Sequence, residues 1–197
     1  MSSIIKVDTI QNQSGANIIS ENSNTITVGA SGDTVNVPSG ATLDMSNGTM
    51  TLHSSMKNTP SFRATLSSNQ TISHDTLTRV TFDTEEYDTN SAFASNIFTV
   101  PSGEGGKYAF HYLLFYDDLD DTDFCLSYIE VDGTIENGTQ DQRYGSAGTQ
   151  NTTLQCAGVI TLTAGQTVEV VTKHGIGSNQ ELRSSQTYFQ MHKMIGL

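Results

Sequence analysis

The stretch Gly106–Asp123, GKYAFHYLLFYDDLDDTD, joins a long apolar run to a concentrated negative charge. Alternation along a β-strand places successive side chains on opposite faces of a sheet. One face of this run would carry Tyr108, Phe110, Tyr112, Leu114 and Tyr116. The other face is also largely apolar and would carry Ala109, His111, Leu113 and Phe115. A sandwich covers one face of each sheet, so the second face needs either water or another subunit, and its apolar character argues against water.

The chain on either side of this run has the pattern of an all-β protein. Short segments of alternating polarity are separated by Gly, Asn and Asp, whereas no amphipathic helix of useful length is present. This pattern predicts a β-sandwich. The candidate strands are Ser61–Leu66, Leu77–Phe82, Ala92–Val100, Lys107–Tyr116, Phe124–Val131, Thr153–Leu162, Thr167–His174 and Thr187–Ile195.

The chain changes character near Met56–Pro60. All seven Tyr and all eight Phe lie downstream, where they supply the area that a compact core buries. Upstream, a short motif recurs in which Thr is followed by an apolar, a variable and another apolar residue. Its four copies are TITV (Thr25–Val28), TVNV (Thr34–Val37), TLDM (Thr42–Met45) and TMTL (Thr49–Leu52). This spacing predicts a stack of very short strands with turns between them.

Two small apolar residues per strand cannot offset the conformational entropy of an isolated chain. Residues 23–57 are therefore predicted to form a β-repeat stalk that three identical chains build together, and the alternative is a flexible Ser/Thr/Gly-rich linker. Residues 1–22 have two short apolar pairs in a polar setting, which suits an attachment segment. Residues 58–197 would form the sandwich, or head.

Charge and cysteine usage exclude several classes of protein. The net charge of −12, with no basic run, disfavours nucleic acid and anionic membranes as partners. No apolar stretch is long enough to span a bilayer, and the N-terminus MSSIIKVDTIQNQSG lacks the pattern of a secretory signal. Cys125 and Cys156 lie in apolar alternating runs without ligand spacing, which predicts buried free thiols rather than a metal site.

One ordered set of residues resembles a known family. Phe82, Asp88, Phe93 and Phe98 precede a run of Gly106-x-Tyr108-x-Phe110-x-Tyr112. This set resembles the signature of the globular head of complement component one, q subcomponent, whose jelly roll is shared with the tumour necrosis factor family. The segment Val159–Val170, VITLTAGQTVEV, resembles that family's strand–turn–strand, with Gln166 in place of the usual Asp.

The resemblance covers residues 60–197 and implies a homotrimeric jelly roll in which three subunits pack through aromatic faces. The residues assigned to the trimer interface or core are Tyr108, Phe110, Tyr112, Leu114 and Phe189. His111 would lie on the less aromatic face. It is interpreted as a satisfied buried histidine rather than a catalytic or metal-binding group.

The acidic loop that follows contains Asp117, Asp118, Asp120, Asp121 and Asp123. Five carboxylates so close together repel one another unless water or a cation neutralises them. Members of the resembled family often bind calcium in loops at one end of the trimer, which implies a candidate calcium site here. The run lacks the residue order of an EF-hand, and a solvated loop without metal is the alternative. The expected cofactor is therefore none, or calcium.

The N-terminal residues and the Thr-rich repeats resemble the corresponding regions of tail-fibre and other appendage proteins of tailed phages. This resemblance implies a virion structural protein, assembled in the host cytoplasm, that binds other virion proteins through its N-terminus and a host glycan or outer-membrane protein through its head. Candidate receptor-binding residues are Arg143 and Tyr144 in the predicted loop Asp141–Gln150. The alternative is a capsid decoration or tail-tip adaptor.

An enzyme is not expected, because the chain contains neither G-x-S-x-G nor H-E-x-x-H.

Overall fold

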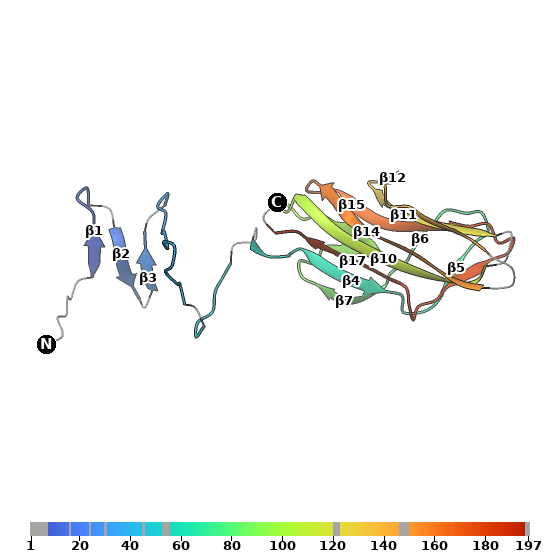
Figure 1. The fold of residues 1–197 in the computed structure, drawn as a ribbon, viewed down its shortest axis with the longest axis horizontal. Coiled ribbons are helices and arrows are strands. Elements are labelled where there is room, and N and C mark those ends of the chain that lie inside the picture. Colours follow the sequence, from blue (N-terminus) through green and yellow to red (C-terminus); the bar gives the residue numbers. More distant parts are fainter. Residues whose placement is uncertain are drawn as a thin grey trace. The chain divides into compact units, whose positions relative to one another are not determined.

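The computed structural model describes residues 8–15, 17–23, 25–29, 31–44, 46–52, 56–119, 123–145 and 150–195. The chain separates into two compact units, residues 1–51 and 52–197. Strands are the regular secondary structure of both units (Figure 1). Within the described ranges, no helix is long and apolar enough to cross a membrane.

The N-terminal unit contains one small antiparallel sheet in the order β1-β2-β3. Its strands are β1 (Thr9–Gln11), β2 (Asn17–Asn22) and β3 (Thr25–Val28). The sheet includes residues on both sides of position 22, where the sequence analysis separates an attachment segment from a stalk.

The first Thr-rich repeat forms β3, but the described residues of the three later repeats, 34–37, 42–44 and 49–52, form no strand in a single chain. In its described residues, one chain therefore lacks the predicted stack of strands, and the stalk built by three chains stays a prediction. The physical reason is that their apolar side chains, including Val35, Val37, Leu43 and Met50, have nothing to pack against and remain exposed.

The C-terminal unit is a sandwich of two antiparallel sheets, so the predicted all-β sandwich is confirmed. Among the described residues the first sheet has the order β5-β16-β10-β17-β4-β7, and β14 also pairs with β10. Its strands are β4 (Ser61–Thr65), β5 (Gln70–Ile72), β7 (Thr84–Asp88), β10 (Gly106–Leu119), β14 (Gln150–Leu162), β16 (Gln180–Leu182) and β17 (Tyr188–Lys193).

The second sheet has the order β12-β11-β15-β9-β8, with β13 on β11 and β6 on β15. Its strands are β6 (Thr78–Arg79), β8 (Phe93–Ala94), β9 (Ile97–Thr99), β11 (Phe124–Val131), β12 (Thr134–Ile135), β13 (Asp141–Tyr144) and β15 (Thr167–His174). The predicted strand Ala92–Val100 is thus two strands, because Ser95 and Asn96 have positive φ and turn the chain back on itself.

The core lies between the sheets and is dominated by aromatic rings. Phe62 on β4 stacks on Phe93 and Phe98 from the second sheet, at ring-centroid distances of 4.4 and 5.2 Å. It also meets Phe189 of the adjacent strand β17 edge-on at 5.0 Å. Stacked and edge-on ring pairs add to the free energy of burying the rings themselves. Phe62 therefore ties the two sheets together.

Strand β14 lies at the edge of the first sheet. It pairs with residues 106–116 of β10, and β17 pairs with residues 108–113 of the same strand, so β14 and β17 must lie on opposite sides of β10. No strand among the described residues pairs with the other side of β14. From Gln150 to Leu162 this edge has no charged side chain, although charged residues are a common protection of exposed sheet edges.

Position 158 on this edge strand needs a glycine, because the ring of Phe110, the residue paired with it on β10, occupies the space that a side chain would need. A Cβ atom at position 158 would approach two ring carbons to 2.9 and 3.0 Å. We expect Gly158→Ala to lower the free energy of unfolding by about 1–3 kcal/mol, because the buried ring has little room to move. Chemical denaturation of the full chain measures this change in the free energy of unfolding. In a Phe110→Leu background the same change should cost little, and an equal cost in both backgrounds would refute the ring as the cause.

Candidate functional site

The outward side of the first sheet is the candidate functional surface, and we call it the outer face. Along each strand the alternate side chains enter the core, so the remaining ones form this face. It consists of Thr153, Gln155, Ala157 and Val159 of β14, Ala109, His111, Leu113 and Phe115 of β10, Tyr188, Gln190 and His192 of β17, and Arg63 of β4. These side chains are half-buried or exposed, and Val159 is 54% exposed.

On β4 and β17, the Arg63 guanidinium contacts several side chains of the outer face at once. The Arg63 guanidinium lies 3.9 Å from the centre of the Tyr188 ring and donates to Gln190 Oε1 at 2.7 Å. Its Nε also lies 2.9 Å from Glu86 Oε2. A guanidinium that is stacked, hydrogen-bonded and paired at once loses little conformational freedom when a partner binds. This part of the face is therefore pre-organised.

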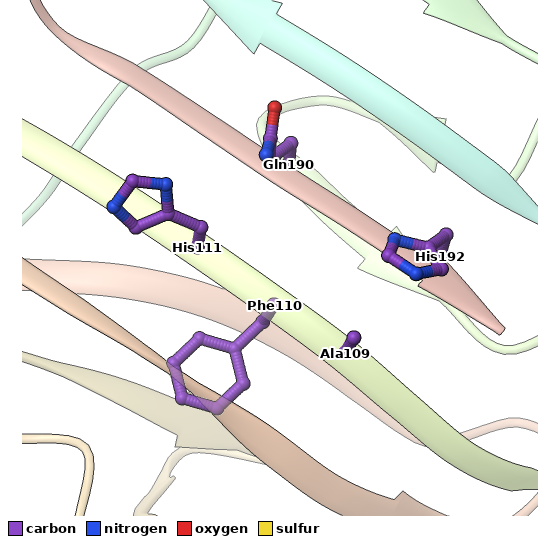
Figure 2. Close-up of a pocket in the computed structure, with 5 residues that line it drawn as sticks. All are labelled: Ala109, Phe110, His111, Gln190 and His192. Carbon is purple, nitrogen blue, oxygen red and sulfur yellow. The ribbon is translucent and has the colours of Figure 1, made fainter. Parts of the chain in front are cut away.

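A small cavity opens beside this cation. It has a volume of about 140 Å³ and is lined by Ala109, Phe110, His111, Gln190 and His192. Figure 2 shows His111, Gln190 and His192 on two neighbouring strands, with the Phe110 ring directed to the opposite side. Small-molecule sites usually enclose about 300–1,000 Å³, so this cavity suits one side chain of a protein partner better than a substrate.

His111 is the ordered side chain at the centre of the outer face. Its Nδ1 lies 3.0 Å from the Tyr188 hydroxyl, and the two rings meet edge-on at 5.3 Å. His111 has the hydrogen-bond partner that was predicted, but it is half-buried where a buried histidine was predicted. No group of three or more His, Cys, Asp or Glu side chains in the described ranges is placed to hold a metal ion.

The residues assigned to the trimer interface or core lie in the core of one chain. Tyr108, Phe110, Tyr112, Leu114 and Phe189 are all buried between the sheets. Tyr112 donates its hydroxyl to the Thr139 carbonyl oxygen at 2.8 Å, and burial raises the pKa of Tyr112 above its usual value. The same strands present the outer face on their other side.

The acidic loop is described in part. Asp120 and Asp121 lie outside the described residues, as does the side chain of Asp118. Asp117 at the end of β10 is ion-paired with Arg183, which donates from Nε to Oδ2. The other carboxylate oxygen of Asp117, Oδ1, is buried and has no hydrogen-bond partner. The calcium site stays a prediction.

The candidate receptor residues lie on a strand instead of the predicted loop. Arg143 and Tyr144 are the last residues of β13, which pairs with the start of β11. Arg143 pairs with Asp141 at 3.1 Å. Tyr144 is 72% exposed, yet Gln142 Nε2 donates to its hydroxyl at 2.7 Å and so fixes one end of the ring.

Both cysteines are free thiols. Cys125 is buried, as predicted, whereas Cys156 on the edge strand is only partly buried. Burial raises the pKa of Cys125 to about 12, so the thiol stays protonated and unreactive at neutral pH.

Sequence reasoning missed the contacts that order the outer face. Arg63 and Gln190 are 127 positions apart, and no local pattern connects them. The one usable signal was the alternation in Gly106–Tyr116, which already showed a second apolar face.

No protein-family model matches the chain, and no curated protein matches it. Murine APRIL at pH 5.0 is similar in structure, with a TM-score of 0.50 and 17% identity over 68% of this chain and 98% of that chain. The globular domain of zebrafish complement 1qA has a TM-score of 0.47 and is 17% identical, over 70% of this chain and 98% of that chain. Eiger TNF from S. frugiperda has a TM-score of 0.47 and is 15% identical, over 70% of this chain and 92% of that chain.

The likeness to murine APRIL shows the fold of the C-terminal unit and nothing beyond it, because identity is low. The predicted jelly-roll fold of the C-terminal unit is therefore confirmed.

Proposed function

We propose that this chain is the subunit of a homotrimeric virion appendage, such as a tail fibre, whose head binds the surface of a bacterial host. The outer face carries the proposal. It presents Leu113 and Phe115 half-buried and Val159 54% exposed, with the Arg183 guanidinium 5.7 Å from the centre of the Phe115 ring. Burying such a face against copies of itself removes apolar area from water, which is the main favourable contribution to association.

The N-terminal unit supports the same assembly. Ile26, Val35 and Leu43 are each at least 64% exposed, and one chain offers them no core. If three chains lay side by side, each of these apolar side chains could pack against the apolar side chains of the neighbouring chains. In the proposed appendage, residues 1–57 attach to the other proteins of the virion.

The head would bind a glycan or an outer-membrane protein. Tyr144 and Arg143 on β13 are the candidate contacts, because an exposed ring held by Gln142 offers a flat surface without a large entropy cost. Each head would bind weakly. Once one appendage on a particle is bound, the others would meet the host surface at a high effective concentration, so the particle would bind more tightly than a single head.

Two experiments on the full chain test the proposal. Light scattering coupled to size exclusion should give three times 21.2 kDa, and a stable monomer would overturn the trimer. The fluorescently labelled trimer should then stain at least one strain in a panel of bacteria, with loss of staining in Tyr144→Ala at unchanged mass. A trimer that stains no strain would favour a capsid decoration or tail-tip adaptor.

A further inference from the structure

The loop between β15 and β16, residues 175–179, is fastened by two histidine rings. The backbone N–H of Gly177 donates to His74 Nδ1 at 2.9 Å, and the N–H of Ile176 donates to His174 Nδ1 at 3.3 Å. His74 lies in the separate loop that follows β5, and the two ring centroids are 6.4 Å apart. Two neighbouring amides of one loop thus depend on imidazole acceptors from different segments.

These contacts define the protonation state of both rings. His174 Nε2 lies 2.8 Å from the Ile72 carbonyl oxygen, which can only accept, so the ring proton must be on Nε2. Nδ1 then has the lone pair that the Ile176 N–H requires. His74 Nδ1 must likewise be unprotonated to accept from Gly177. A protonated imidazole has a donor at both nitrogens, and neither loop contact survives that change.

The surroundings of His174 favour its neutral form. The ring is completely buried, and Tyr116 of β10 meets it edge-on at 5.8 Å. Cys125 of β11 is its cross-strand neighbour. Burial lowers the pKa of His174 below its usual range, and the nearby His74 acts in the same direction.

Other charged groups lie around the two rings. The Ile72 contact and the charge of Asp123 oppose the effect of burial on the pKa of His174, and each contributes less than burial does. Asp75 and Lys173, next in sequence to the two histidines, pair with each other at 2.7 Å.

We propose that His74 and His174 form an acid-sensitive latch that holds loop 175–179 while both rings are neutral and releases it when they are protonated. Acid is therefore expected to loosen this loop before the sandwich unfolds. Histidine is the side chain whose unperturbed charge change lies nearest neutral pH, so acid is the signal that this latch would respond to.

The sign of the stability change follows from the pKa of His174. The pKa of its folded state lies below the ordinary value of 6.5. The stabilisation is then fully present above pH 6.5 and is lost as the pH falls below that value and through the folded-state pKa. Acidification should act first on the contacts of loop 175–179.

Amide hydrogen exchange in the full chain at pH 7.5 and pH 5.0 tests the latch, after correction for the intrinsic pH dependence of exchange. The protection of Ile176 and Gly177, read residue by residue, should fall on the order of fivefold at the lower pH, which is the loss of one hydrogen bond. The variant His74→Asn keeps an acceptor oxygen near the position of Nδ1 and cannot be protonated in this range. Gly177 should stay protected at pH 5.0 in this variant.

His53→Asn is the matched control, because it also removes one imidazole and the acceptors of the two loop contacts are His74 and His174. It should show the same loss of protection as the unmodified chain. Equal protection of both amides at the two pH values would overturn the latch. An equal loss at Gly177 in His74→Asn and in the unmodified chain would also overturn it.

Discussion

Phe62→Ala is expected to lower the free energy of unfolding of the head by about 3–5 kcal/mol. The Phe62 side chain is completely buried and contacts three other rings, two of them in the opposite sheet. Removing it loses the transfer free energy of the ring and leaves a cavity that Phe93, Phe98 and Phe189 cannot close without leaving their own positions. Because single domains are typically stable by about 5–15 kcal/mol, the loss is a large share of the total.

Denaturant-induced unfolding, followed by far-ultraviolet circular dichroism on the full chain, measures the effect. Tyr144→Ala is the matched control, since it also deletes an aromatic ring but from a position that is 72% exposed. Its cost should stay within about 0.5 kcal/mol. A cost for Phe62→Ala below about 1 kcal/mol would mean that the ring cluster is not what joins the sheets.

The long strands were predictable from sequence because each alternates over many residues. Phe124–Val131 and Thr167–His174 begin and end where they were predicted, and the predicted strand Lys107–Tyr116 lies within β10. A long alternating run fixes which side chains enter the core, since a slip by one residue would expose all of them. The motif around Gly106 could therefore indicate the fold as well.

The short strands were not predictable. β5, β12 and β16 have two or three residues each, too few for any period to show. They form because the long strands beside them offer free backbone groups, as when Tyr116 of β10 pairs with Leu182 of β16. β13 was predicted as a loop for the same reason, and it is a strand because the start of β11 pairs with it.

The candidate site was predictable only as a surface. Alternation in β10 indicated a second apolar face, but not that Arg63 would lie over Tyr188 there. The latch is a similar case, because His74 and Gly177 are 103 positions apart and their contact depends on how two loops meet. Single histidines scattered along a sequence give no sign of such a contact.

If the protein is the proposed trimer, Val159→Glu is expected to separate it into monomers. Val159 is half exposed on the edge strand β14, opposite Ala109 of β10, so the substitution removes little from the core of one chain. In the proposed trimer the outer face is covered, and each subunit would then bury a carboxylate without a partner. The cost is on the order of several kcal/mol for each buried ion. That corresponds to a weakening of association on the order of a hundredfold or more.

Light scattering at micromolar concentration should therefore give a mass near 21.2 kDa for this variant, with the β-sheet circular dichroism of the unmodified chain. Ile135→Glu is the matched control, because Ile135 is 49% exposed on β12 of the other sheet. It introduces the same charge away from the outer face and should leave the mass at three times 21.2 kDa. If Val159→Glu kept the trimer and Ile135→Glu broke it, the subunits would meet through the second sheet, and the outer face would be free for the host receptor.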